Sequence, residues 1–348
     1  MTIDTSESQF EKNIESILLS KDYIKREPKD LDKEHVIDIE LFCQFIQDNQ
    51  KENWQKLQEI FGSDVQKKIL QAYEKELESR PLIDLIRKGL VISEVKLDCV
   101  FFKPVSKMNP DAEREFQSNI LSVIRQAVTK LGSIPDLTLC LNGIPVATAE
   151  IKNPATAQTY EDAITQYRED RDPKDKLFSF KRGALVHFAV DPHEVHMTTK
   201  LQQDKTIFLP FNKGRDDGKG NPHNPNGFDT SYLWEEIWQR DTWIDIITTF
   251  IEYQLISQKY PLPHKENIIF PRYHQFDSVQ KLVDETKQNG AGKNYLAQQS
   301  TGSGKSNTIS WLGYKLRSLH DSKDAEIFDS ILILSDRVNI VNQLTNTV

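Results

Sequence analysis

The chain has 348 residues, of which 38% are hydrophobic and 28% are charged, a composition typical of a soluble protein with two or three domains. No apolar run approaches the roughly 20 residues that a membrane-spanning helix requires, so we expect no membrane segment. The net charge of -8 excludes a protein that coats nucleic acid through its overall charge, although it leaves room for a local basic track.

The cysteines and the N-terminus indicate a reducing compartment. Cys43, Cys99 and Cys140 are scattered and lack the spacing of metal ligands. Residues 1–8 have neither the basic flank nor the apolar stretch of an export signal. We therefore expect a cytoplasmic protein.

Hydrophobic periodicity predicts a helix over residues 9–19, with Phe10, Ile14 and Leu18 on one face. Residues 36–90 continue the helical pattern but are strongly charged, which indicates a helical insertion or a partner-binding face. The elements predicted after it are strands at 91–95 and 99–102, a helix at about 111–131, a strand pair across 136–152, a helix near 159–169, and strands at 184–190 and 195–198.

The second half of the chain begins with a loop at 212–227, rich in Gly, Asn and Pro. Residues 230–258 are predicted to be helical and carry three tryptophans. From Asn267 onward a strand–loop–helix–strand pattern is typical of an α/β nucleotide-binding domain. These changes divide the chain into 1–205, a connector at 206–265, and 266–348.

A glycine-rich loop at 301–306 lies between the strand-like run 294–298 and the helix-like run 305–316. Its glycines allow backbone N–H groups to approach phosphates, and the helix N-terminus adds partial positive charge. Lys305 is expected to reach the β- and γ-phosphates of ATP, and Ser306 to ligate Mg²⁺. The predicted ATP-binding residues of the loop are Thr301, Gly302, Ser303, Gly304, Lys305 and Ser306. The alternative is a glycine-rich turn without a ligand, and Gln299 stands where the strict phosphate-loop pattern has glycine.

Alternating apolar residues on both sides of Asn142-Gly143 predict a β-hairpin over 136–152. A two-residue turn would pair 141 with 144 and place Asp136 opposite Ala149, away from Glu150. A three-residue loop with a bulge at Gly143 pairs 140 with 144 and sets Asp136 opposite Thr148, with Glu150 diagonal on the same face. We predict the bulged turn, because it separates polar from apolar side chains on both strands.

In that register Asp136, Glu150 and Lys152 share one face of the hairpin. Two carboxylates within reach of one ion suit Mg²⁺, which lowers the pKa of a bound water and stabilises charge on a phosphate. Lys152 is expected to orient the attacking water or to neutralise developing charge. The pattern predicts a metal-dependent nuclease, with a solvated strand face as the alternative.

Three weaker signals accompany this pattern. Glu11 either faces the hairpin and helps to hold the metal or forms a surface salt bridge. His193 and His196 make a poor metal site, because two histidines alone provide too few ligands. Basic residues from 168 to 182 either contact the phosphates of DNA or, as we favour, form a solvated charged face. These are Arg168, Arg171, Lys174, Lys176, Lys181 and Arg182.

Taken together, the residues resemble the motor (R) subunit of type I restriction endonucleases over essentially the whole chain, which would be about the N-terminal third of such a subunit. The stretches that carry the resemblance are 135–145, 150–154, 163–168, 188–192, 230–235 and 270–275. The resemblance implies an α/β fold in which a nuclease domain of the Pro-Asp…(Asp/Glu)-x-Lys class precedes a RecA-like lobe of superfamily 2 helicases.

By this resemblance Asp136, Glu150 and Lys152 take the nuclease roles, and Gln275 reads the adenine of ATP. The alternative for Gln275 is a polar residue at the N-terminus of a helix. The family often has a Gln-x-x-x-Tyr motif after the nuclease lysine, and here Gln166-Tyr167 stands in its place. Gln166 is carried over as a catalytic residue, whereas the role of Tyr167 stays open. Residues 331–337 resemble the next helicase motif, whose Arg337 is either a phosphate contact or a solvated side chain.

The resemblance also implies Mg²⁺ and ATP as cofactors, duplex DNA as substrate, and assembly with methyltransferase (M) and specificity (S) subunits. The sequence reaches Val348 without the Asp-Glu-x-His motif and second lobe that ATP turnover requires, so we expect ATP binding without turnover, with translocation in a longer parent protein. Two rival hypotheses remain: a helicase-type ATPase whose N-terminal domain only docks partners, and a fragment that binds companion subunits without chemistry.

Overall fold

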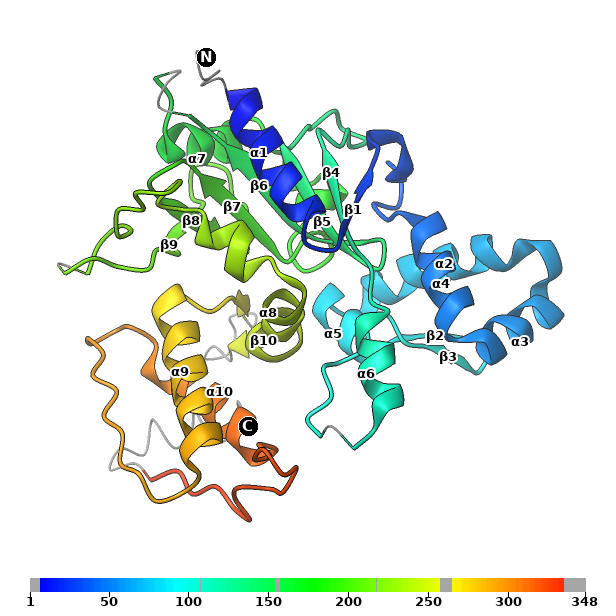
Figure 1. Ribbon diagram of the computed structural model, residues 1–348. Coiled ribbons are helices and arrows are strands. Elements are labelled where there is room, and N and C mark those ends of the chain that lie inside the picture. The colour runs from blue at the N-terminus through cyan, green and yellow to red at the C-terminus, as the bar shows by residue number, and fades with distance from the viewer. Residues whose placement is uncertain (1–6, 107, 154–156, 217, 257–264, 335–348) are drawn as a thin grey trace. The chain divides into compact units, whose positions relative to one another are not determined.

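The computed structural model describes residues 7–106, 108–153, 157–216, 218–256 and 265–334 (Figure 1). The chain divides into two units, one made of residues 1–102 and 115–270, and the other of residues 103–114 and 271–348. In the described ranges, no helix combines the length and apolar character needed to cross a membrane.

Unit 1 is built on a mixed seven-stranded sheet, which confirms the predicted α/β class for this part of the chain. The strand order is β1-β4-β5-β6-β7-β8-β9. The β1–β4 and β6–β7 pairs are parallel and the remaining pairs are antiparallel. The strands are β1 Tyr23–Arg26, β4 Leu121–Arg125, β5 Leu137–Leu141, β6 Ile144–Ile151, β7 Val186–Val190, β8 Val195–Thr198 and β9 Leu209–Pro210. Every residue of β5, β6 and β7 is buried, so both faces of the central strands are covered.

Helices α1 (Glu7–Leu19) and α7 (Tyr160–Glu169) cover opposite faces of this sheet (Figure 1). Glu11 of α1 bonds Arg125, which pairs with Leu137 across β4 and β5. Tyr167 of α7 bonds Thr148, which pairs with Thr138. Successive side chains of a strand point to opposite faces, so Leu137 and Thr138 lie on different faces of the sheet. Helix α1 therefore covers the face of Leu137, and α7 covers the face of Thr138. Both helices agree with the elements predicted at 9–19 and 159–169.

The helical pattern predicted for 36–90 is confirmed. It forms α2 Ile39–Asn49, α3 Lys51–Phe61, α4 Val65–Ser79 and α5 Leu82–Lys88, followed by a short hairpin of β2 Leu90–Ile92 and β3 Val95–Leu97. Asp38 caps α2 by accepting from the Leu41 amide, and its buried carboxylate pairs with Arg26 of β1 at 2.6 Å. This ion pair ties the insertion to the edge of the sheet.

The helix predicted at about 111–131 is wrong beyond residue 117, since α6 covers only Pro110–Gln117. Leu121–Arg125 forms β4 instead, because its β-branched residues pair with β1 and β5 on both sides. The strand predicted at 99–102 is also not formed. Short 3₁₀ turns of unit 1 lie at Pro28–Asp30, Gly62–Asp64 and Lys176–Phe178.

The predicted helical segment after the 212–227 loop consists of a π-type turn at Leu233–Ile237, α8 Arg240–Asp245 and a second π-type turn at Ile246–Phe250. Its three tryptophans are buried. Trp238 and Trp243 pack against Phe188 of β7, with ring centroids 5.5 and 6.3 Å apart. The segment ends in β10 Glu252–Ile256, which pairs with β11 Lys265–Ile269 rather than continuing as a helix.

In unit 2, α9 Tyr273–Asn289 and α10 Lys305–Arg317 pack against each other. The strand-like run 294–298 does not form a strand, and neither do residues 331–334, the described part of the second helicase motif. A strand needs a neighbour for its backbone hydrogen bonds, and the described residues of unit 2 offer none. The rest of the predicted motif at 331–337, including Arg337, lies outside the described residues. The RecA-like sheet expected for 266–348 is therefore not present in the described part of this unit.

Candidate active site

The β5–β6 hairpin positions the first candidate residues, and its turn differs from the predicted one. Leu141 pairs with Ile144, so the loop has only the two residues Asn142 and Gly143, with φ of 51° and 83°. Both values fit a type I′ turn. The backbone at Gly143 lies so close to Asp38 that a Cβ there would approach Asp38 O to 2.4 Å. The tertiary contact with α2, together with the positive φ values, therefore selects the tight turn.

The bulge lies further along β6 instead. The register shifts between Leu139, which pairs with Ala147, and Cys140, which pairs with Pro145, so Val146 is the extra residue. Beyond the shift Thr138 pairs with Thr148, and continuing this register sets Asp136 opposite Glu150. The predicted pairing of Asp136 with Thr148 is thus wrong by two residues. Since two residues preserve parity, Asp136 and Glu150 still share one face.

Asp136 and Lys152 are held by backbone contacts at the end of β6. The Ile151 amide donates to Asp136 Oδ2 at 2.7 Å, which fixes this carboxylate against the neighbouring strand. The Lys152 amide donates to Val190 O at 2.8 Å and continues the β6–β7 pairing by one residue. That pairing keeps the Lys152 side chain on the face of Glu150. Both side chains are buried.

Glu150 is fully buried and has an incomplete set of partners. Its Oε1 accepts from Arg171 Nε at 2.7 Å, whereas Oε2 is buried and has no hydrogen-bond partner among the described residues. Burial, and then the nearby Asp136 carboxylate, raise the pKa of Glu150 to about 8, although Arg171 acts in the opposite direction. The site thus contains two adjacent carboxylates, and loss of solvent is the main reason that Glu150 holds its proton more tightly than usual.

Arg171 is the residue that sequence reasoning missed. It follows α7, and besides Glu150 its Nη2 donates to Ile134 O at 2.8 Å, in the loop that leads to Asp136. The Arg171 side chain is only 7% exposed. It had been predicted as part of a solvated basic face. No local pattern marks it, because the contact depends on how α7 crosses the sheet.

A neutral hydrogen-bond network lies beside Glu150. Thr148 Oγ1 is 2.8 Å from both Tyr167 Oη and His187 Nδ1, and all three side chains are buried. Burial raises the pKa of Tyr167 and lowers the pKa of His187 to about 3, so neither is charged near neutral pH. Tyr167, whose role the sequence left open, therefore fixes α7 onto β6.

The glycine-rich loop in unit 2 brings two distant motifs together. Gln275 Nε2 donates to Gly304 O at 2.9 Å, and a Cβ at Gly304, whose φ is +86°, would lie 2.3 Å from that nitrogen. Lys305 Nζ donates to the carbonyls of Gln299 and Ser300 at 3.3 and 2.8 Å. Lys305 also begins α10, as predicted. A ligand phosphate at this loop would compete with those carbonyls for the lysine.

Comparison with known proteins identifies the family. Residues 4–206 match the family model described as "Type I restriction enzyme R protein N terminus". The chain belongs to this family. Among its relatives are two putative type I restriction enzyme endonuclease subunits of Methanocaldococcus jannaschii. MjaVIIIP is 27% identical over 282 residues, and MjaVIIP is 25% identical over 274 residues. These alignments cover 76% and 75% of this chain but only 23% of each relative, so the chain spans about a quarter of their length.

Two of the candidate residues, Gln166 and Glu11, do not contact Asp136 or Glu150 in the described part of the chain. Gln166 is half-buried on α7, its Oε1 has no partner, and no contact in the described part of the chain links it to Asp136 or Glu150. Glu11 pairs with Arg125 at 2.7 Å on the opposite face of the sheet, which confirms the predicted salt bridge, although Glu11 is buried rather than at the surface.

The two histidines of the weaker metal-site signal lie near carboxylates instead. His193 Nδ1 is 3.0 Å from Asp229 Oδ2, and His196 Nε2 is 3.6 Å from Glu194 Oε2. No cluster of three or more metal-binding side chains occurs within the ranges that the structure describes.

Proposed function

We propose that this chain carries the nuclease centre of a type I restriction enzyme and supports Mg²⁺-dependent hydrolysis of duplex DNA. Membership of the R-protein family gives the setting. The observation that carries the proposal is Glu150, a fully buried carboxyl opposite Asp136, with a raised pKa and one oxygen without a partner. A buried acid of this kind requires either a proton or a cation, and a divalent cation satisfies both carboxylates together.

The donor set fits Mg²⁺. Protein sites for this ion commonly use one or two carboxylates and complete its octahedral shell with water and substrate phosphate. Asp136 and Glu150 would hold the ion. When bound, it stabilises the negative charge that develops on the scissile phosphate and acidifies water for the attack.

The chain's own side chains have distinct tasks in this proposal. Lys152 supplies a positive charge on the same face, suited to orienting a water or neutralising the leaving group. Arg171 holds Glu150 through Oε1 and leaves Oε2 for the cation. The Thr148–Tyr167–His187 network supports β6 without adding a competing charge. Gln166 is retained as a proposed polar contact from α7.

We further propose that residues 301–306 bind the phosphates of ATP and that Gln275 binds its adenine. The contact between Gln275 and Gly304 supports this, because it joins the two motifs that such a nucleotide would bridge. Binding of a non-hydrolysable ATP analogue, measured by calorimetry on the full chain, is expected to be lost in Lys305→Ala. Unchanged binding in that variant would refute the ATP assignment.

The nuclease proposal is tested with the R protein assembled with its methyltransferase and specificity subunits. Mg²⁺-dependent cleavage of duplex DNA is expected to be lost in Asp136→Ala and Lys152→Ala, with assembly intact. If Glu150→Ala spares every activity, the N-terminal region is a docking domain of an ATPase and the proposal fails. If all variants assemble and the unmodified complex does not cleave, the chain is a non-catalytic binding subunit.

A further inference from the structure

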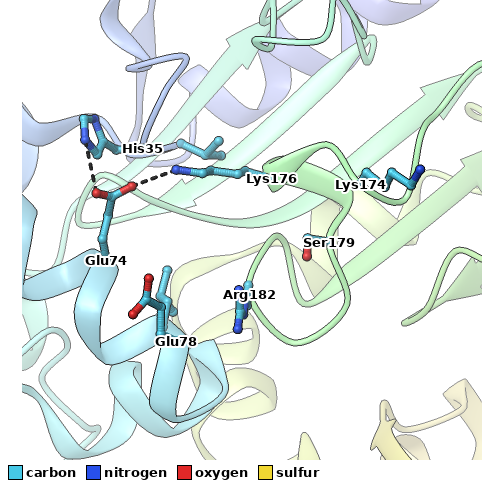
Figure 2. Close-up of a pocket in the computed structure, with 9 residues that line it drawn as sticks. His35, Glu74, Glu78, Lys174, Lys176, Ser179 and Arg182 are labelled. Carbon is cyan, nitrogen blue, oxygen red and sulfur yellow. Dashed lines mark hydrogen bonds and ion pairs between the residues drawn. The ribbon is translucent and has the colours of Figure 1, made fainter.

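A cavity of about 270 Å³ lies in unit 1 between α4 and the segment 174–182 (Figure 2). Glu74 and Glu78 line it from α4, whereas Lys174, Lys176, Ser179 and Arg182 line it from the facing segment. One wall is therefore acidic and the other basic. The cavity is separate from the group formed by Asp136, Glu150 and Lys152.

Most of the basic residues from 168 to 182 already have partners. Arg168 donates to Thr206 O, Arg171 to Glu150, Lys176 to Glu74, and Lys181 to Glu266. Lys174 and Arg182 are the exceptions within the described residues, since neither side chain has a hydrogen bond or ion pair. Both of these exposed cations line the cavity.

The charges on the acidic wall are unequal. Glu74 is compensated by Lys176 at 2.7 Å, and the Nε2 atom of His35 lies 3.5 Å from its carboxylate (Figure 2). Glu78 has no such partner among the residues that the structure describes. Excluding the compensated Glu74–Lys176 pair, Lys174 and Arg182 exceed Glu78 by one positive charge, and Ser179 adds a hydroxyl that can donate.

This donor set is suited to a singly charged phosphodiester. A guanidinium, an ammonium and a hydroxyl are the groups that commonly bind backbone phosphates. A diester carries one negative charge, which matches the excess in the cavity.

Two structural links connect the cavity to the nuclease residues. Arg171, which bonds Glu150, lies three residues before Lys174 in the same segment. Val36 lines the cavity and belongs to the apolar cluster that contains Tyr167, whose hydroxyl bonds Thr148. The cavity therefore lies on the Glu150 side of the sheet.

We propose that this cavity binds a backbone phosphate of the DNA duplex, with Lys174, Ser179 and Arg182 as donors. The proposal rests on the DNA-cleaving function proposed above and assigns part of the DNA contact surface. Through Arg171, a phosphate held here restrains the segment that positions Glu150.

The test measures the binding of duplex DNA to the full chain without Mg²⁺. Fluorescence anisotropy reports the affinity at several salt concentrations. The Lys174→Ala/Arg182→Ala variant is expected to bind roughly tenfold more weakly at low salt. Its slope of log affinity against log salt should fall in magnitude by about 1, the value for one phosphate contact. The matched control is Lys51→Ala/Lys56→Ala, which removes the same charge from exposed positions on α3.

Equal affinities and salt slopes for the two double variants would overturn the proposal. So would binding of inorganic phosphate that depends on Lys174 and Arg182 while duplex binding does not. Glu78→Gln should tighten duplex binding, because it removes the opposing charge, and weaker binding would contradict the assignment. Cleavage by the assembled complex that carries Lys174→Ala/Arg182→Ala separates the two proposals. If this variant still cleaves DNA and binds duplex like the control variant, the cavity proposal is rejected and the nuclease proposal is not.

Discussion

Replacing Arg171 with alanine tests how the site is held together. Its guanidinium joins Glu150 Oε1 at 2.7 Å to Ile134 O at 2.8 Å, with side-chain exposures of 7% for Arg171 and 0% for Glu150. Removing one partner of a buried ion pair costs about 3–5 kcal/mol when the other charge stays ionised. Little of that cost applies here, because with a pKa of about 8 Glu150 is already largely protonated at neutral pH when Arg171 is present. We therefore expect a smaller loss of about 2–3 kcal/mol from the two hydrogen bonds.

The larger effect concerns the pH dependence of Mg²⁺ binding. Without the guanidinium, the pKa of Glu150 rises further, so the ion must displace a proton that is held more tightly. Each pKa unit gained costs about tenfold in apparent Mg²⁺ affinity below that pKa. At higher pH, where Glu150 is ionised, the variant is expected to bind Mg²⁺ more tightly, because the guanidinium no longer repels the cation. The Mg²⁺-binding curve should consequently shift to higher pH rather than fall at every pH.

Two measurements check this prediction. Urea unfolding without Mg²⁺ gives the free energy of unfolding, and calorimetry between pH 6.5 and 9.5 gives the Mg²⁺ affinity. Arg171→Lys should recover part of both losses. The control is Arg168→Ala, which removes a guanidinium that donates to Thr206 O and does not contact Glu150. If Arg171→Ala matches this control in stability and in pH profile, Arg171 does not position Glu150.

Two further predictions concern the supporting structure. Gly143→Ala should lower the free energy of unfolding by more than about 2 kcal/mol, because its Cβ would clash with Asp38 O; Gly132→Ala, which has φ of +86° and open space, should cost only about 1 kcal/mol. Equal losses in urea unfolding would show that backbone conformation alone matters at residue 143. His187 is neutral when folded, with its pKa lowered to about 3, so protonation of the unfolded chain should reduce stability as pH falls from about 6.5 toward 3. The decline should approach about 1.4 kcal/mol per pH unit and be weaker in His187→Asn; equal pH dependence in the two proteins would contradict the burial argument.

The hairpin residues were predictable because their chemistry and spacing are local. Alternating apolar residues around Asn142-Gly143 indicated the hairpin, and parity placed Asp136 and Glu150 on one face. The position of the bulge was not predictable. It depends on α2, whose Asp38 approaches the turn and favours the two-residue loop. A register error of two residues left the shared face unchanged.

The remaining errors arise where tertiary pairing overrides local pattern. Leu121–Arg125 has a sequence compatible with a helix, yet strand partners on both sides make it β4. The run 294–298 has strand-like residues but no partner strand among the described residues, and it stays irregular. Arg171 could not be assigned from a charged stretch in which Glu169, Asp170 and Asp172 surround it.

Proton release on Mg²⁺ binding tests the central claim most directly, namely that Asp136 and Glu150 together hold a divalent cation. Because burial and Asp136 raise the pKa of Glu150 to about 8, Glu150 is largely protonated at pH 7, and cation binding must expel that proton. Calorimetric titration of the full chain with Mg²⁺ in two buffers of different ionisation enthalpy gives the number of protons released. We predict a value close to one, falling toward zero by pH 9.5 and absent in Glu150→Gln. Mg²⁺ binding without proton release at pH 7, or the same release from Glu150→Gln, would contradict the account.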